Sequence, residues 1–329
     1  MTKIEILTGV RPTGDLTIAN YLGAIKPIIE LQDKGQSPLI FVADLHAITD
    51  NEPVNAKKFI HEVVASYIAL GTNPNKTKIF LQSDIENEVA VLTMFLSRLI
   101  TVSELLRVPT LKEKLKANVR PETANTFLLL YPVMMTADIL LQRAEKIPVG
   151  KDQLAHLEVG RELARRFNKR YGKIFPIPQP LQIDALKILS LKGEGKMSKS
   201  SPEGAIFLTD DAKTVTKKIK GAETAFEGVM NEKLESHILV AKSLSKTDQE
   251  REEIDSLIRE HKKGKPVMGK FKQLFIRITN NFLAEFQAKK NEIVQNNSLI
   301  PSILEEGSKT ARANAQKTLQ LVKKAMYRS

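Results

Sequence analysis

The chain of 329 residues contains no cysteine and no tryptophan, and aromatic residues make up only 5% of it. The lack of cysteine excludes disulfides, thiol catalysis and cysteine-ligated zinc, and it fits a cytoplasmic location. The longest apolar run, residues 127–141, contains Pro132 and Asp138 and is too short and polar to span a bilayer, so we expect no membrane association. The first residues lack the basic and apolar segments of a signal peptide, so none is expected.

Basic residues are in excess. Fifty Lys and Arg against 38 Asp and Glu give a net charge of +12, while 42% hydrophobic and 27% charged residues are typical of a globular protein. The length suggests about two domains. The basic excess favours a polyanionic partner such as nucleic acid, although a basic but otherwise ordinary surface would explain it equally well.

The first part of the chain alternates short apolar runs with helical patterns. Strands are expected at residues 3–8, 39–43, 78–82, 147–149 and 186–191, and helices at 57–70, 88–100, 123–143 and 152–170. This alternation predicts an α/β fold with a Rossmann-like parallel sheet. The long connection between the third and fourth strands predicts a helical insertion at about 86–143, within a first domain of residues 1–205.

The remainder of the chain shows helical periodicity only. Helices are expected at residues 211–220, 234–244, 248–261, 267–294 and 299–326. The sequence therefore predicts an all-helical C-terminal domain at 206–329.

A glycine-containing loop, Thr8 to Gly14, follows the first expected strand and leads into a helix. Loops at the carboxyl end of a first parallel strand bind nucleotides, and the following helix N-terminus offers N–H groups to phosphate. A tight structural turn would account for the loop alone.

A second loop carries Lys196-Met197-Ser198-Lys199-Ser200 behind two glycines. Two lysines and two hydroxyls on a glycine-hinged loop suit a pyrophosphate whose charge grows in a transition state. A solvated lysine and serine loop is the less favoured interpretation.

Together these motifs resemble a known family. Lys196 to Ser200 resembles one hallmark of class I aminoacyl-tRNA synthetases, and Thr17-Ile18-Ala19-Asn20 stands where the other opens the first helix. The Thr-x-x-Asn form is similar to bacterial tryptophanyl-tRNA synthetases. Further similar blocks follow in the family's order at residues 44–49, 131–141, 149–153 and 161–172.

The resemblance implies formation of an adenylate from L-tryptophan and Mg²⁺-ATP, followed by transfer of tryptophan to the 3′ end of tRNA(Trp). It implies a homodimer joined through the helical insertion, an anticodon-binding role for residues 206–329, and no resident metal. The catalytic residues it implies are Thr17, Asn20, Lys196, Ser198 and Lys199. The ATP-binding residues it implies are Arg11, Pro12, Thr13, Ala19, Asn20, Gly150, Lys151, Asp152, Ile188, Lys196, Met197, Ser198, Lys199 and Ser200.

The resemblance also implies a tryptophan site. Asp138 would accept the indole N–H, since a carboxylate in an apolar helix needs a partner, although a structural partner would also satisfy it. Tyr131 and Gln153 would orient the α-amino group. Leu7, Met135 and Val149 would line the indole pocket, although Leu7 and Val149 could equally be sheet core.

Three residues depart from the family pattern. Ala19 replaces a glycine that lets adenine approach the backbone, Arg11 stands where many relatives have glutamine, and Lys151 stands where an acidic residue is usual. Neither the change at Ala19 nor the change at Arg11 removes a charged catalytic group. His46 could contact substrate or lie in the core.

Alternative functions stay open at this point. They are a tyrosine-charging relative, a catalytically silent protein that binds tRNA or tryptophan, and a helical nucleic-acid binder, which would leave the sheet motifs unexplained. Two basic groups are expected to contact tRNA, although both could be solvated faces. They are Arg107, Lys112, Lys114, Lys116 and Arg120, and the segment 259–272.

Overall fold

Five parallel strands form the centre of the computed structural model, which describes residues 2–12, 14–49, 56–116, 120, 124–150, 154–183 and 186–327. The strands are β1 (Leu7–Val10), β2 (Leu39–Val42), β3 (Ile79–Leu81), β4 (Lys146–Pro148) and β5 (Gln179–Leu181). β2 pairs with β1 and β3, and β4 pairs with β5. A parallel bridge between Ile6 and Lys146 brings β4 beside β1. The order is therefore β5-β4-β1-β2-β3, and it reverses direction at β1.

β2 is buried on both faces of the sheet, as its continuous apolar sequence predicts. Ile40 and Val42 belong to one hydrophobic cluster, whereas Leu39 and Phe41 belong to another on the opposite face. Successive side chains of the strand point to opposite faces of the sheet, so the core is divided into two layers, each covered by helices.

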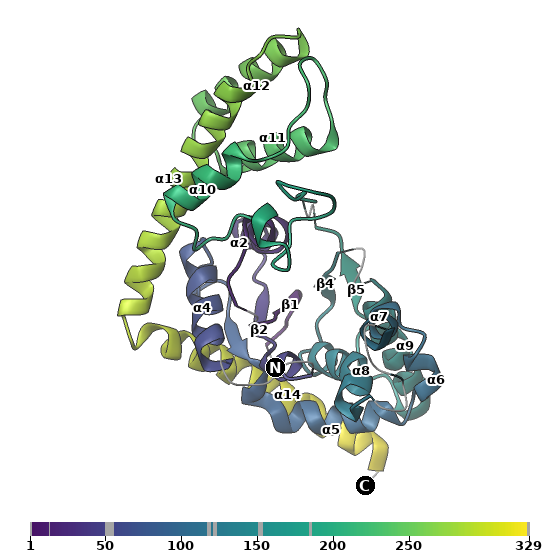
Figure 1. Ribbon diagram of the computed structural model, residues 1–329. Helices are drawn as coiled ribbons and strands as arrows, with labels where there is room; N and C mark the ends of the chain where they lie inside the picture. The colour runs from purple at the N-terminus through teal and green to yellow at the C-terminus, as the bar shows by residue number, and fades with distance from the viewer. Residues whose placement is uncertain are drawn as a thin grey trace.

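Helices cover both faces of the sheet (Figure 1). The first cluster is closed by α1 (Ile18–Asn20), the π turn η1 (Tyr21–Ile25), α2 (Lys26–Asp33), α4 (Ala56–Ala69), α10 (Ala212–Lys220), α11 (Glu232–Leu244), α12 (Asp248–Lys262) and α13 (Met268–Gln295). The second is closed by α5 (Glu86–Ser97), α6 (Val102–Leu105), α7 (Pro109–Lys116), α8 (Thr126–Leu141), α9 (Leu154–Tyr171) and part of α14 (Leu299–Tyr327). Short helical turns complete the chain: α3 (Asp44–Ala47), η3 (Gln82–Ile85) and η6 (Pro202–Gly204). Within the described part of the chain, no helix has the length and apolar character to cross a membrane.

The predicted fold class is confirmed, but the strand predicted at residues 186–191 is wrong. An antiparallel bridge between Leu189 and Lys196 makes that segment one arm of a tight hairpin, and Ile188 is buried among helices. The fifth strand is instead β5, which contains Pro180. Proline argues against a central strand, but β5 lies at the edge of the sheet, where proline is tolerated.

The last helix, α14, departs from the other C-terminal helices. In Figure 1 it runs back to the base of the molecule, beside α5. Its first turns join the first hydrophobic cluster through Ile303 and Leu304, and its later turns join the second through Ala311 and Leu319. α14 therefore covers the edge strand β3, which would otherwise expose an unpaired edge. The division of the chain after residue 205 stays a prediction.

Gly307 sets how closely α14 approaches β3, and we expect Gly307→Ala to destabilise the fold. A Cβ at this position would lie 1.9 Å from the carbonyl oxygen of Ile79, a backbone atom that cannot easily move. Overpacking of this kind costs about 1–3 kcal/mol, to be read from urea unfolding midpoints. Gly269→Ala in α13 is the control, because a Cβ there meets no atom within 4 Å. Equal unfolding midpoints for the two variants would contradict the close approach.

Candidate active site

A cavity of about 370 Å³ opens where the carboxyl ends of β1 and β4 meet. The strand order reverses at β1, so this is the position at which open parallel sheets bind ligands. Its walls come from both strands, the end of β2, and helices α8 and α9. The lining residues are Leu7, Thr8, Gly9, Arg11, Phe41, Ala43, His46, Thr49, Tyr131, Met135, Ile139, Ile147, Pro148, Val149 and His156.

Four of the residues predicted for tryptophan binding lie in this wall: Leu7, Tyr131, Met135 and Val149. Helix α8 continues through Pro132, so Tyr131 and Met135 fall one turn apart on the same face. Gly9 leaves room for an aromatic wall, because a Cβ there would lie 2.5 Å from the ring of Phe41. The result is a mainly apolar slot with a few polar groups.

Asp138 lies behind this wall and is only 3% exposed. Its carboxylate accepts hydrogen bonds from Gln82 Nε2 at 2.8 Å to each oxygen, and His46 Nε2 lies 2.9 Å from Oδ2. Burial raises the pKa of Asp138, and the hydrogen bonds from His46 and Gln82 partly offset that rise. The carboxylate thus has partners within the protein, while His46 stands between it and part of the cavity.

Tyr131 and His156 form a second polar contact in the cavity wall. The Tyr131 hydroxyl lies 2.8 Å from His156 Nε2, and the two rings meet edge to face with centroids 5.4 Å apart. They come from different helices, α8 and α9, and both are buried.

The tetrapeptide Thr17-Ile18-Ala19-Asn20 forms the start of α1 through a capping box. Thr17 Oγ1 accepts the Asn20 N–H at 3.2 Å, and Asn20 Oδ1 accepts the Thr17 N–H at 2.9 Å. Because Oδ1 is engaged, the Nδ2 amide is the end of Asn20 that can meet a phosphate. The π turn η1 follows at once, an irregularity frequent at functional sites.

The hairpin that carries Lys196 to Ser200 contacts the first glycine loop. Lys199 Nζ donates to the carbonyl oxygen of Gly14 at 3.1 Å, and burial lowers the pKa of Lys199 while Asp15 offsets part of that effect. Ser198 and Ser200 are joined through their hydroxyls at 3.0 Å, and Lys196 is exposed. Both predicted motif loops therefore meet, although they are 185 residues apart.

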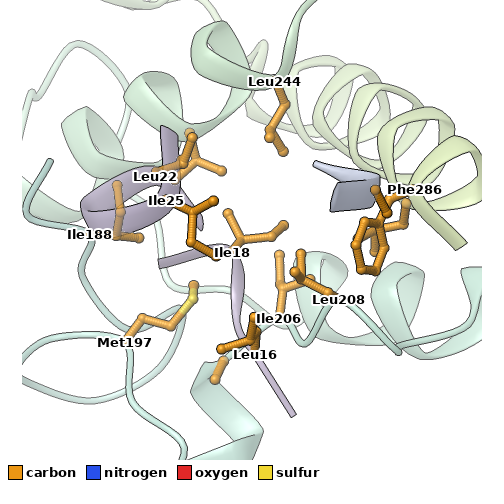
Figure 2. Packing of buried hydrophobic residues seen from close by; sticks show 14 of the residues in the cluster. Leu16, Ile18, Leu22, Ile25, Ile188, Met197, Ile206, Leu208, Leu244 and Phe286 are labelled. Carbon is orange, nitrogen blue, oxygen red and sulfur yellow. The ribbon is translucent and has the colours of Figure 1, made fainter. Parts of the chain in front are cut away.

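Two residues predicted to bind ATP place their side chains in the core. Ile188 and Met197 pack with Ile18, Leu22 and Ile25, as Figure 2 shows. Their backbones are joined by a hydrogen bond from Met197 N to Ile188 O at 2.9 Å. Any contact they make with a nucleotide would therefore be through the main chain.

The other predicted residues occupy varied positions. Arg11 lines the cavity, where its Nη2 donates to the His46 carbonyl at 3.0 Å. Pro12 is buried and Ala19 half-buried against the core, whereas Gly150 follows β4. Thr13, Lys151, Asp152 and Gln153 lie outside the described residues.

Sequence reasoning missed the cavity residues Phe41 and His156, and also Gln82, which holds Asp138. It left His46 open between substrate contact and the core, and the structure places His46 in the cavity wall. Phe41 and His46 lie at or after the end of β2, so the rule that ligands meet the carboxyl ends of strands could have indicated them. No sequence signal marks His156 or Gln82, because their partners lie on other elements.

Comparisons with known proteins bear out the resemblance. Residues 1–316 match the family of tRNA synthetases class I (W and Y). A tryptophan–tRNA ligase of Treponema pallidum is 34% identical over 330 residues, covering 98% of this chain and 96% of that relative. One from Bacillus anthracis is 36% identical over 332 residues, covering 98% of this chain and 97% of the relative. The crystal structure of tryptophanyl-tRNA synthetase from Campylobacter jejuni with ADP and tryptophan matches with a TM-score of 0.84 and 32% identity, covering 98% of this chain and 100% of that one. The chain belongs to the class I tRNA synthetases of the tryptophan and tyrosine family.

Proposed function

We propose that the chain is an ATP-dependent tryptophan–tRNA ligase, which forms tryptophanyl-adenylate and transfers the amino acid to tRNA(Trp). The observation that carries this is one continuous loop. It leaves β1, lines the apolar cavity at Arg11, and then meets Lys199 at Gly14. An amino-acid site and a phosphate site thus adjoin. Charging of tRNA(Trp) with labelled tryptophan, at a rate dependent on ATP, tests the proposal.

The amino acid occupies the cavity with its indole between Leu7, Met135 and Val149, and Asp138 accepts the indole N–H. Tyr131 and Gln153 hold the α-amino group. A tyrosine-charging enzyme is disfavoured because the similar bacterial relatives are named for tryptophan and the slot walls are mainly apolar. A catalytically silent relative would be expected to lack phosphate-side motif residues, whereas Lys196, Lys199 and Asn20 are all present.

ATP enters with Mg²⁺ on its phosphates and lies over the start of α1, with Asn20 and Lys199 facing the phosphates. Thr17 holds Asn20 in place, Lys196 and Ser198 close over the leaving group, and Thr13, Lys151 and Asp152 complete the ATP site with the neighbouring backbone. The substrate carboxylate attacks the α-phosphorus and pyrophosphate leaves. No protein nucleophile is needed, so the protein contributes positioning and charge stabilisation.

The tRNA contacts the tip of the helical part, near α12 (Figure 1). Phe226 is 85% exposed in the loop before α11, and Lys262 is exposed at the end of α12. His261 Nε2 donates to the Val229 carbonyl at 2.8 Å, which ties this loop to the basic turn that follows α12. An aromatic ring beside cations suits an unpaired base and its phosphates. Lys112 and Arg107 on the insertion are exposed and serve the acceptor end.

Two kinds of variant should affect tRNA affinity differently. Lys262→Ala with Lys270→Ala should weaken binding and reduce the salt slope by about 0.7–0.9 for each phosphate that is no longer neutralised. Phe226→Ala should weaken binding by about 1–3 kcal/mol with the slope unchanged, because stacking carries no charge. Titrations of tRNA(Trp) at several salt concentrations measure both. Lys309→Ala on α14 is the control, and unchanged affinity in the first two variants at every salt concentration would contradict this tRNA face.

The protein acts as a homodimer in the cytoplasm, where its tRNA is used. Three large apolar side chains are exposed on the insertion: Met94 on α5, Val102 on α6 and Phe127 on α8. Met94 is 74% exposed, and in a monomer the exposure of this large apolar side chain to water would contribute nothing to stability. Met94→Glu should therefore convert a sedimenting dimer to a monomer, and a stable, active monomer of the unaltered chain would refute the dimer.

A further inference from the structure

The direction of the hydrogen bond between Tyr131 and His156 determines which group the Tyr131 hydroxyl can offer to the substrate. We infer that His156 is a positioning residue: it holds the Tyr131 hydroxyl with its proton turned away from the cavity, so that the oxygen accepts a hydrogen bond from the substrate's α-ammonium group. This inference rests on the proposed function, and it gives His156 a role in recognising the amino group.

The contacts between the Tyr131 and His156 side chains hold both of them in place. The hydroxyl lies 2.8 Å from His156 Nε2, and the exposed fractions are 7% for Tyr131 and 5% for His156. The edge-to-face ring contact restrains the imidazole further. Both residues line the cavity, so the pair belongs to the wall that an amino acid would touch.

The chemistry of the two groups decides the direction. A phenol has one proton to donate and lone pairs to accept, whereas an ammonium group has three donors and no acceptor. When His156 Nε2 accepts the hydrogen bond donated by the phenol O–H, the side of the tyrosine oxygen that faces the cavity offers lone pairs only. Without an acceptor at position 156, the hydroxyl proton is free to turn into the cavity, where it opposes the ammonium group.

A pair of substitutions separates the hydrogen bond from the shape of the side chain. His156→Phe keeps a ring of similar size but offers no acceptor, and His156→Gln restores an acceptor at a similar reach. Binding is measured by calorimetry for L-tryptophan, for tryptamine, which has the amino group but no carboxylate, and for indole-3-propionate, which has the carboxylate but no amino group.

His156→Phe should weaken tryptophan and tryptamine by about tenfold or more, since a hydrogen bond to a charged group is removed. Indole-3-propionate should bind as to the unaltered protein, which also shows that the variant is folded. His156→Gln should recover most of the affinity for the two amines. In a Tyr131→Phe background, His156→Phe should add no further loss, because the histidine acts through the tyrosine.

Two results would overturn the inference while leaving the proposed function intact. One is an equal loss for all three ligands, which would mean that His156 only shapes the cavity. The other is an additive loss in the Tyr131→Phe background. If the unaltered protein binds none of the three ligands, the proposed function fails, and the inference fails with it.

Discussion

Lys199→Met should reduce tryptophan-dependent ATP–pyrophosphate exchange by about a hundred- to a thousandfold, the usual cost of removing a preorganised charge-stabilising donor. The ammonium group of Lys199 is held at the Gly14 carbonyl, between the two motif loops. It is half-buried, and burial lowers its pKa, so the cation is poorly solvated there and gains most when negative charge grows beside it. The pyrophosphate leaving group supplies that charge.

The stability of the same variant distinguishes catalysis from structure. A lysine whose folded-state pKa is lowered disfavours the folded state while it is charged, at pH values below that pKa. Removing the charge should therefore leave the free energy of unfolding at neutral pH unchanged or slightly higher. Lys192→Met is the matched control, because Lys192 lies in the same hairpin and is exposed. Its ion pair with Glu203 is a loose one, with Nζ 3.9 Å from Oε2. Exchange activity that falls equally in both variants would assign Lys199 no special role.

Asp138→Ala should lower kcat/KM for tryptophan by about ten- to more than a hundredfold, the cost of leaving a buried donor unpaired. The variant also strands Gln82 and His46, whose hydrogen bonds now go to the carboxylate. That part of the loss is the same for any substrate. An analogue with sulfur in place of the indole nitrogen has no N–H to strand, so it should lose much less.

Asp138→Asn refines this comparison. Its amide keeps the shape and one acceptor oxygen, so tryptophan should lose less activity than with alanine. ATP binding without amino acid should barely change in either variant, because Asp138 lies behind the cavity wall, bound to Gln82 and His46, and not among the phosphate contacts. Equal losses for tryptophan and the sulfur analogue would make Asp138 a structural partner of Gln82 and His46 only.

Much of the fold could be predicted from periodicity and from hydrophobic runs. The five long helices from α10 to α14 begin and end within about two residues of the predicted positions, because each is amphipathic and several begin at a capping side chain such as Asp211. The error at β5 has a local cause. Pro180 obscured a short edge strand, while the apolar alternation of residues 186–191 belongs to one arm of a hairpin, which buries Ile188 and Leu191 in the core.

The site could be predicted only where a motif marks it. Lys199 and the Thr17 tetrapeptide stand in contiguous motifs, which one sequence reveals, whereas the contact of Lys199 with Gly14 depends on the fold. The pairs that shape the cavity join distant parts of the chain: His46 and Asp138 are 92 residues apart, and Tyr131 and His156 are 25 apart on different helices. Such pairs depend on helix packing, which one sequence does not reveal. The same limit applies to α14. Its periodicity predicted its length, but the sequence did not show that it packs against the edge strand β3.

The most direct test of the central claim is ATP–pyrophosphate exchange with the purified full chain and a panel of the standard amino acids. The cavity is mainly apolar, has a volume of about 370 Å³ and adjoins the loop that meets Lys199. We therefore expect exchange with L-tryptophan and only background exchange with L-tyrosine and the others. Exchange supported best by tyrosine, or by no amino acid while ATP still binds, would contradict the assignment.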